Sequence, residues 1–402
     1  MVTYEKLADV ANIIDSLHKT PKYSDDGFPM VRVTDIKGGY LKLNGTKRVT
    51  KNTYEKFTKR YKPQFGDVIF SRVGSYGNSC FVNDSIKFCL GQNTVAFRPK
   101  INPFYFFYCI NSNFVKNQIE SLVGGASQQT ISLKNLGIIK IPIFNIIFQQ
   151  KIASILSAYD DLIENNIRRI KILEEMAQAI YKEWFVNFRF PSYEKVKFVN
   201  SPLGKIPEGW EVMNIEDIAD TLGGGTPSTK KEEYWVNGNI DWFTPSDLTK
   251  NISLVLLDSV KKINDLGLKK SSAKLFPPKT IMMTSRATIG YFGIINKESC
   301  TNQGFINIIP KKDEWRYYIL YNLMNRKEEI IGNANGATYK EIIKSRFRKM
   351  SILLPEFYLV KEFQKLIEHI IEEIKNLTTK NQNLSKTRDL LLPKLISGEV
   401  EV

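Results

Sequence analysis

The chain has 402 residues, 43% of them apolar, and a formal net charge of +15 at neutral pH. This length exceeds one ordinary domain, so we expect two or three domains with separate hydrophobic cores. No stretch reaches the roughly 18 apolar residues that a membrane-spanning helix needs, and the N-terminal residues lack the features of a secretory signal peptide. We therefore expect a cytoplasmic protein that does not enter a membrane.

Cysteines and histidines are too few and too scattered to predict a metal or catalytic centre. Cys80, Cys89, Cys109 and Cys300 show no CxxC spacing, which favours reduced thiols over a disulfide framework or a zinc site. The two histidines lie far apart in the sequence, which disfavours Ser-His-Asp and metal–histidine mechanisms. A nuclease site built from carboxylates alone stays open.

Two blocks of the chain repeat one order of motifs. A Thr-Pro pair precedes “PMVRVTDI” in the first block and “IDWFTPSDL” in the second. “FGDVIFSRVGSYG” then corresponds to “PPKTIMMTSRATIG”, and “GQNTVAFRPK” to “NQGFINIIPK”. Short β-branched and aromatic runs between Gly, Pro and Asn predict twisted sheets with small helices. Each block is thus expected to be an α+β domain.

A long helix is predicted after each block. From Gln149 to Phe185, and again from Phe363 to Leu395, apolar residues recur at alternating spacings of four and three, which is a heptad pattern. Aligning the two “FQ” pairs without gaps places Asn166 and Asn381 at the same heptad position. We predict that these asparagines fix the register between the helices; an exposed asparagine beside a bend is the alternative.

Two further features concern the ends of these helices. Arg388 falls on a heptad position and Pro393 interrupts the pattern, which predicts fraying or a kink near the end of the second helix. The first helix ends in Trp184 and Phe185, followed by Phe188 and Phe190, and we expect these rings to pack against the second block. The proline-punctuated stretch from Phe188 to Trp210 is predicted to be a linker.

These patterns divide the chain into four segments that differ in charge. They are a first block at residues 1–142, a central helical segment at 143–190, a linker with the second block at 191–355, and a C-terminal helical segment at 356–402. Residues 1–143 hold twenty basic and ten acidic residues, and residues 191–355 hold twenty-four and eighteen. The helical segments are nearly neutral. The local excess indicates a polyanionic partner, with solubility as the alternative purpose.

The motifs that phosphate or cofactor chemistry requires are missing. No GxxxxGK[ST] loop is present, nor the Asn/Asp-Pro-Pro-aromatic tetrapeptide of adenine methyltransferases. “GGGTPS” lacks the GxGxxG spacing and precedes a charged stretch rather than an apolar helix, which favours a turn. We therefore predict a binding protein with no catalytic residue, metal or cofactor of its own.

The whole layout resembles the specificity subunit of Type I restriction-modification systems. The most specific stretches are “GKIPEGWEVMNIEDIADTLGGGTPS”, “YWVNGNIDWFTPSDL”, “FQQKIASILSAYDDLIENNIRRIKILEEMAQAIYKEWF” and the ending “LLLPKLISGEV”. The first block departs from the pattern because it lacks the “IPxGW” lead-in found at Ile206–Trp210. The resemblance implies two α/β target recognition domains separated by two long helices, which pack as an antiparallel coiled coil in a pseudo-twofold internal repeat.

The resemblance also implies a function. Each domain would bind one half of a bipartite, asymmetric site in double-stranded DNA. The helices would set the spacing and dock two methyltransferase subunits, which carry S-adenosylmethionine and methylate adenine; restriction subunits can join. Two other classes stay open, namely a coiled-coil adaptor that binds DNA without sequence preference and a nuclease or methyltransferase with an unrecognised site.

Candidate DNA contacts follow from charge and side-chain chemistry. Basic residues at one place in the repeat are expected to neutralise phosphates, and they are Lys42, Lys47, Arg48, Lys51, Lys59, Arg60, Lys62, Lys261, Lys262, Lys269, Lys270 and Lys274. Amides and guanidinium groups can bind base edges, and the loop candidates are Arg72, Gln92, Asn93, Gln128, Gln129, Arg286, Gln303, Asn335 and Tyr339. Because Arg72 and Arg286 recur at one repeat position, a shared backbone or structural role is favoured for them.

Overall fold

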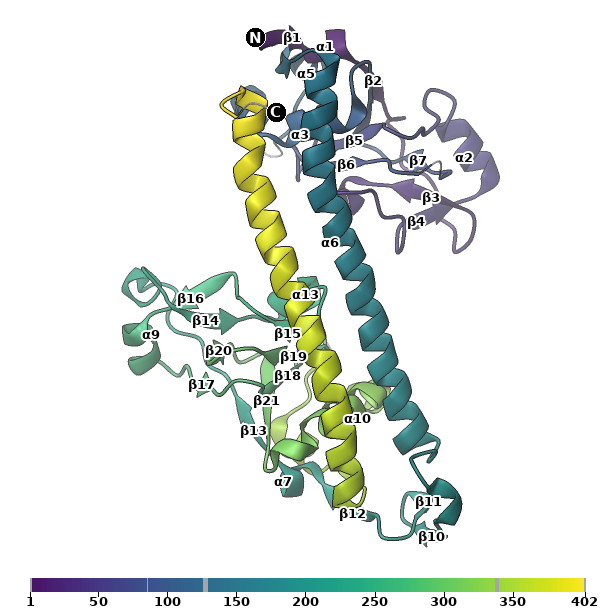
Figure 1. Ribbon diagram of the computed structural model, residues 1–402, viewed down its shortest axis with the longest axis vertical. Helices are drawn as coiled ribbons and strands as arrows, with labels where there is room; N and C mark the ends of the chain where they lie inside the picture. The colour runs from purple at the N-terminus through teal and green to yellow at the C-terminus, as the bar shows by residue number, and fades with distance from the viewer. Residues whose placement is uncertain (1, 85, 126–128, 337–339, 401–402) are drawn as a thin grey trace. The chain divides into compact units, whose positions relative to one another are not determined.

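The computed structural model describes residues 2–84, 86–125, 129–336 and 340–400, and its elements are labelled in Figure 1. The chain forms two compact units, one of Met1–Ile163 with Asn383–Val402 and one of Glu164–Gln382. Each unit therefore combines one sequence block with parts of both long helices. The four segments predicted from the sequence are consecutive stretches of the chain, whereas the two units are defined by contacts. The four-segment division therefore stays a prediction.

The first unit contains a mixed sheet system with short helices. Its four-stranded sheet has the order β2-β8-β5-β6, a three-stranded sheet has the order β4-β3-β7, and β1 pairs with β9. Strands β3 and β7 run parallel, whereas the other pairs are antiparallel. The strands are β1 Thr3–Lys6, β2 Ala11–Asp15, β3 Phe28–Val31, β4 Lys47–Val49, β5 Val68–Ser71, β6 Ser79–Phe81, β7 Cys89–Leu90, β8 Thr94–Pro99 and β9 Lys140–Ile143, and the helices are α1 Leu7–Val10, α2 Lys51–Phe57, α3 Pro103–Asn111, α4 Asn113–Leu122 and α5 Leu133–Ile138.

The second unit repeats this topology with additions. Its sheets have the orders β13-β21-β18-β19-β15 and β16-β14-β20-β17, while β12 pairs with β22. The pair β14–β20 is parallel, like β3–β7 in the first unit. The strands are β12 Glu211–Asn214, β13 Ala219–Gly223, β14 Ile240–Phe243, β15 Val255–Leu256, β16 Lys261–Ile263, β17 Leu275–Phe276, β18 Ile281–Thr284, β19 Phe292–Ile295, β20 Ser299–Thr301, β21 Phe305–Pro310 and β22 Ser351–Leu354, and the helices are α7 Ile215–Ile218, α8 Pro245–Lys250, α9 Asp265–Lys269, α10 Arg316–Asn325, α11 Lys327–Gly332 and α12 Lys344–Arg348.

A strand buried on both faces organises the core of each unit. Alternate side chains of a strand point to opposite faces, and a strand covered on both sides is therefore apolar throughout. In β5, Val68 and Phe70 enter one apolar cluster and Ile69 enters another. In β18, Ile281 and Met283 enter one cluster and Met282 the other. The unbroken apolar runs before the two Ser-Arg pairs thus become the central strands.

Both predicted long helices are present. Helix α6 spans Ile146–Tyr181, 36 residues, and passes into one π-helical turn at Lys182–Val186. Helix α13 spans Phe357–Ser397, 41 residues, and contains Pro393. The prediction of fraying at Pro393 is wrong, because the helix continues to Ser397. No helix in the described ranges is long and apolar enough to cross a membrane.

Polar groups at heptad positions of the helices pair with one another inside each unit. In the second unit the Asn166 amide donates to the Asn381 carbonyl oxygen at 2.8 Å, and both side chains are buried. In the first unit Arg388 forms an ion pair with Asp160, which also accepts a hydrogen bond from the hydroxyl of Tyr108 at 2.6 Å. In the second unit the two helix segments run antiparallel, because Arg169, which follows Asn166, binds Glu373, which precedes Asn381, at 2.9 Å.

One glutamine joins each long helix to the α+β domain in its own unit. The side-chain oxygen of Gln149 accepts a hydrogen bond from the backbone N–H of Asn102 at 3.1 Å, just before α3. Gln364 accepts from the backbone N–H of Tyr317 at 3.2 Å, in the first turn of α10. The first-turn amides of a helix have no partner inside the helix. The repeated “FQ” motif therefore anchors equivalent domain helices.

The aromatic residues at the end of α6 pack into the second unit, as predicted. Phe185 lies 4.9 Å from Tyr318 and 6.0 Å from Trp210 between ring centroids. Phe188 and Phe190 also contact Trp210. The predicted linker between them contains a hairpin of β10, Phe198–Ser201, and β11, Gly204–Pro207.

We expect Asn166→Ala to destabilise the second unit by about 1–3 kcal/mol, because it removes a hydrogen bond and leaves the buried Asn381 amide without this donor. Replacing both asparagines by leucine should restore most of the stability, since no buried amide then remains there. Chemical denaturation of the two variants measures this difference. Equal losses in both variants would contradict the role of the pair.

Candidate nucleic-acid interface

The first basic segment, Tyr40–Pro63, covers β4 and α2. Thr50 caps α2 by accepting a hydrogen bond from the backbone N–H of Thr53 at 3.4 Å. Arg48 donates to the backbone oxygen of Gly27 at 2.6 Å, which fixes its side chain near the β3–β4 pair. The predicted phosphate ligands of this segment are all exposed, and they are Lys42, Lys47, Arg48, Lys51, Lys59, Arg60 and Lys62.

Several of these cations are available for a ligand. In the described part of the chain, Lys47, Lys51, Lys59 and Arg60 form no ion pair with an acidic side chain. An exposed lysine without a carboxylate partner retains its full charge for a phosphate. The segment therefore presents a positive surface at one edge of the first domain, and its contact with DNA stays a prediction.

The second basic segment covers β16 and α9 and contains one lysine with a different role. Lys262 lies 3.1 Å from the carboxylate of Asp241, which is completely buried, and 2.7 Å from Asp258. Hydrogen bonds to Asp258 and Asp241 raise the pKa of Lys262. Lys297 approaches the same Asp241 at 2.8 Å. A buried carboxylate needs such cations, so Lys262 has a structural partner that the sequence pattern did not reveal.

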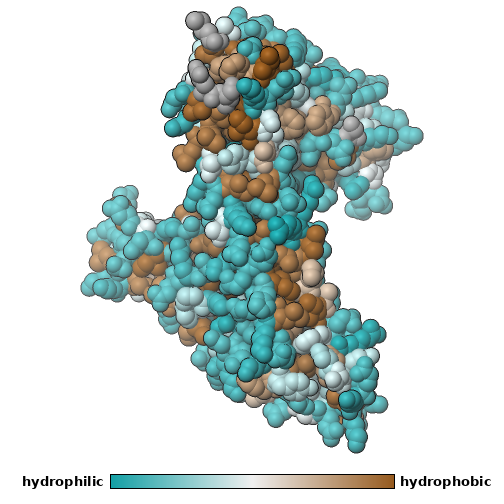
Figure 2. Space-filling model, in the orientation of Figure 1, coloured by the Kyte–Doolittle hydropathy of each residue, from teal (hydrophilic) through white to brown (hydrophobic). Residues whose placement is uncertain are grey.

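The other lysines of this segment are exposed. Lys269, Lys270 and Lys274 lie on and after α9, and the ammonium group of Lys261 lies 5.9 Å from the centroid of the Trp235 ring. In Figure 2, hydrophilic side chains cover much of the visible face, with smaller apolar areas between them. Phosphate binding by these four lysines stays a prediction.

The two repeated arginines hold loops in place. Arg72 donates to the backbone oxygen of Ile131 at 3.0 Å and pairs with Asp15 at 3.1 Å. Arg286 pairs with Glu341 at 2.6 Å, and the backbones of these two residues also form a β-bridge. Each arginine therefore ties the loop after a central strand to a distant segment. These contacts fit the shared structural role that is favoured for the two arginines because they recur at one position of the repeat.

The two repeated glutamines lie beside the threonines of the Thr-Pro pairs. The hydroxyl of Thr20 donates to the side-chain oxygen of Gln92 at 3.4 Å, and Thr226 makes the same hydrogen bond to Gln303. Both glutamines are exposed. The threonine occupies the carbonyl oxygen only, and a glutamine amide also carries two N–H donors. The Thr-Pro pairs are visible in the sequence, but this role of the threonines is not, because each threonine and its glutamine are far apart along the chain.

In the second unit Arg286 and Gln303 line one shallow hollow of about 420 Å³. Its other lining residues come from the start of α8, the loop after β18 and the loop before β21, namely Pro245, Ser246, Thr249, Ala287, Thr288, Asn302 and Gly304. Hydroxyl, amide and guanidinium groups stand among proline, alanine and glycine residues on this surface. It can donate hydrogen bonds to phosphate oxygens or to base edges.

The remaining loop candidates have mixed surroundings. Asn93 adopts a left-handed backbone with φ of 67°, and its carbonyl oxygen accepts from the backbone N–H of Arg72 at 3.0 Å. The side-chain oxygen of Asn335 accepts from Arg346 at 3.1 Å, so this amide is engaged within the fold. Gln129 has an exposed side chain. Gln128 and Tyr339 lie outside the described residues.

The described residues show no grouping of three or more His, Cys, Asp or Glu side chains that could hold a metal ion. All four cysteines are free thiols, and all four are buried. Burial raises the pKa of Cys89 and Cys300 to about 12. These thiols are therefore protonated at neutral pH, which makes them poor nucleophiles.

The fold defines a class of two-domain α+β proteins with an internal repeat and two long helices. A crystal structure of a Type-I restriction-modification S subunit from M. genitalium superposes with a TM-score of 0.56 at 15% identity, covering 98% of this chain and 96% of that one. The family described as “Type I restriction modification DNA specificity domain” matches residues 1–175 and 207–387. The chain belongs to this family.

Two curated relatives are named as specificity subunits of type I restriction enzymes. The chain is 34% identical over 206 residues to the type I restriction enzyme MjaIX specificity subunit of Methanocaldococcus jannaschii, a match that covers 50% of this chain and 46% of that protein. It is 24% identical over 403 residues to the HindI specificity subunit of Haemophilus influenzae, covering 83% of this chain and 86% of the relative. The first match thus spans about half of the relative, and the second spans most of it.

Replacing Lys47 and Lys51 by glutamate should weaken DNA binding and reduce its dependence on salt. Each lost phosphate contact lowers the slope of log K against log salt by about 0.9. Titration of duplex DNA at several salt concentrations measures the slope. Lys361→Glu, an exposed change on α13 outside the basic segments, is the control. An unchanged slope in the Lys47 and Lys51 variant would place the DNA elsewhere.

Lys262→Ala should destabilise the second unit by about 1–2 kcal/mol, because it removes a charged hydrogen-bond donor from the buried carboxylate of Asp241. Lys261→Ala, one residue away and exposed, should leave stability within about 0.5 kcal/mol of the parent. Thermal unfolding compares the two. Similar losses would mean that Lys262 has no special structural role.

Proposed function

We propose that this chain is a DNA specificity subunit in which each α+β domain recognises one half of a bipartite site in double-stranded DNA. The observation that carries the proposal is the structural repeat. A corresponding strand order, with one added strand in each of the two larger sheets of the second unit, recurs in both units. The Thr–Gln hydrogen bond and a basic segment at the same place in the repeat recur as well. Two similar surfaces on one chain suit a site with two separate halves.

The dimensions of the helices support a spacing role. At about 1.5 Å per residue, α6 and α13 extend over roughly 54 and 61 Å. Successive major-groove faces recur every ~34 Å along DNA. Helices of this length can thus hold two domains over separate grooves. The near-neutral charge of the helical segments agrees with a spacer that does not itself bind phosphate.

The partners follow from the family. Two methyltransferase subunits that use S-adenosylmethionine would dock on this chain, and restriction subunits would join such a complex in the cytoplasm. In this arrangement the chain supplies DNA recognition, and the partner subunits supply the chemistry. An adaptor without sequence preference is the competing account, and it requires equal binding to all DNA.

Exchange of residues 1–142 for the equivalent block of another such protein should change one half of the recognised site and leave the other half intact. The complex would be assembled with its methyltransferase subunits, and methylated positions would be mapped on random-sequence DNA. Exchange of the second block is the reciprocal control. A change in both halves would show that the domains do not act independently.

Insertion of one heptad in each long helix, after Ile163 and after Gln382, adds about 10.5 Å to both helices and preserves the heptad pattern. The unspecified gap between the half-sites should then widen by about three base pairs at ~3.4 Å per pair. The same methylation map measures the gap. A seven-residue insertion in α6 alone makes the two long helices unequal in length and shifts their pairing register. This variant should lose site-specific methylation. An unchanged gap with both insertions would exclude a spacing role.

A further inference from the structure

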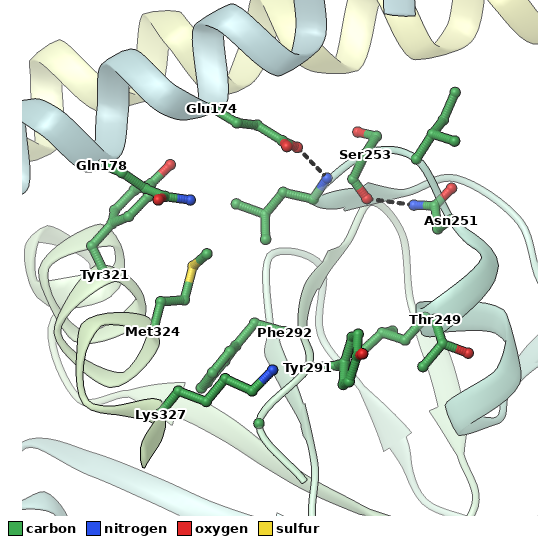
Figure 3. A pocket seen from close by; sticks show the side chains of 14 residues that line it. Glu174, Gln178, Thr249, Asn251, Ser253, Tyr291, Phe292, Tyr321, Met324 and Lys327 are labelled. Atoms are coloured by element: carbon green, nitrogen blue, oxygen red, sulfur yellow. Dashed lines mark hydrogen bonds between the residues drawn. The ribbon is translucent and has the colours of Figure 1, made fainter. Parts of the chain in front are cut away.

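A polar pocket lies within the second unit, between α6, the loop that leads into β15, the start of β19 and helix α10. Its volume is about 310 Å³. Figure 3 shows Glu174, Gln178 and the hydroxyl of Tyr321 on one side and the Lys327 ammonium group with the Tyr291 ring on the other. Between these polar ends lie the apolar side chains of Phe292 and Met324. The pocket therefore combines a carboxylate, a hydroxyl and a cation around an apolar centre.

The Tyr321 hydroxyl is the first sign of a ligand. Tyr321 is 2% exposed, and its hydroxyl oxygen has no hydrogen-bond partner among the described residues. Buried hydroxyl groups are nearly always paired, because leaving one unpaired costs free energy. Its location in the pocket lining means that a molecule bound there could supply the missing partner.

Glu174 is the second sign. One of its carboxylate oxygens accepts a hydrogen bond from the backbone N–H of Leu254 at 2.7 Å. It forms no ion pair with any residue in the described ranges. Burial raises the pKa of Glu174, and the hydrogen bond from Leu254 opposes this shift. A carboxylate held in such surroundings gains from a cation, because the cation offsets the cost of its desolvation.

The first unit shows what occupies the equivalent place. The hydroxyl of Tyr105 on α3 donates to the backbone oxygen of Pro142, and the hydroxyl of Tyr318 on α10 donates to that of Leu353. These equivalent hydrogen bonds identify α3 and α10 as equivalent helices. Three residues further along these helices lie Tyr108 and Tyr321. Tyr108 lines a pocket of about 350 Å³ in its own unit, and its hydroxyl is satisfied there by Asp160.

An arginine of the chain itself completes that pocket. Arg388 binds both Asp160 and Asp389, the latter at 2.8 Å, and all three residues line the pocket. When the two long helices are aligned without gaps on their “FQ” pairs, Asp389 corresponds to Glu174 and Arg388 corresponds to Leu173. The second unit thus keeps the tyrosine and one carboxylate but has an apolar residue where the guanidinium group should be.

We infer that the pocket at Glu174 and Tyr321 receives an arginine side chain from a protein partner. The guanidinium group would donate hydrogen bonds to the Glu174 carboxylate and to the Tyr321 hydroxyl oxygen. In the first unit the chain's own Arg388 donates to the carboxylates of Asp160 and Asp389, and the Tyr108 hydroxyl donates to Asp160. The aliphatic part of the arginine would pack on Met324 and Phe292. The Lys327 ammonium group, 4.3 Å from the centroid of the Tyr291 ring, can donate to a carbonyl oxygen of the same peptide.

This inference rests on the proposed function only for the existence of a protein partner, and its test needs neither that partner nor DNA. Nα-acetyl-arginine amide serves as the probe, titrated into the full chain that carries ¹³C-methyl methionine. Met324 lines the pocket and reports occupancy through its methyl resonance. We expect a saturable shift of this resonance with the arginine probe and none with Nα-acetyl-norleucine amide, which has no guanidinium group.

Variants separate the pocket from its surroundings. Glu174→Gln should weaken binding of the arginine probe at least tenfold while keeping the hydrogen bond from Leu254. Glu175→Gln, a change at an exposed neighbour on α6, should leave binding of the probe unchanged. Tyr321→Phe should weaken binding of the probe about threefold. It should not lower Tm, because the hydroxyl has no partner among the described residues of the free chain. A wild-type chain without a saturable shift, or equal binding by Glu174→Gln, would overturn the inference and leave the DNA proposal untouched.

Discussion

In each unit, a glutamine on a long helix accepts a hydrogen bond from a backbone N–H at the start of a domain helix, α3 or α10. Gln149 and Gln364 are buried or half-buried at these junctions, and each is flanked by an aromatic residue of its “FQ” pair. An amide at the start of a helix has no partner within that helix, so this contact fixes both position and direction. The hydrogen bond therefore fixes the position of the domain, and of any ligand that it binds, relative to the long helix of its own unit.

The central strands supply the rigidity that this arrangement needs. Because β5 and β18 are apolar on both faces, each divides its domain into two packed layers and holds the following loop in one place. Arg72 and Arg286 then connect those loops to distant segments. In each unit, the surface around its own glutamine, Gln92 or Gln303, is thus supported by a buried central strand and by the ion pair of its arginine. A surface held in this way can discriminate between ligands with little loss of conformational entropy.

Much of the fold follows from patterns that are visible in the sequence. Heptad spacing predicts both long helices, and the repeated order of motifs predicts two similar α+β domains. The continuation of α13 through Pro393 was not predictable, because local propensity disfavours proline in a helix interior. There Leu395 and Ile396 are buried in the first unit, and this tertiary packing outweighs the local preference.

The candidate site was harder to predict than the fold. Charge runs identify exposed lysines, yet they cannot show that Lys262 neutralises Asp241, since the two residues meet only when β14 and β16 pair. The Thr–Gln hydrogen bonds join residues that are 72 and 77 positions apart. The pocket at Tyr321 depends on an unpaired hydroxyl, and no sequence pattern reveals an unpaired group.

The most direct test of the central claim is a genome-wide map of methylated adenines in a host that expresses this chain, compared with the same host after deletion of its gene alone. We predict that one motif loses methylation on deletion and that it consists of two short specified halves around a fixed unspecified gap. Persistence of every methylated motif after the deletion would contradict the assignment of DNA specificity to this chain.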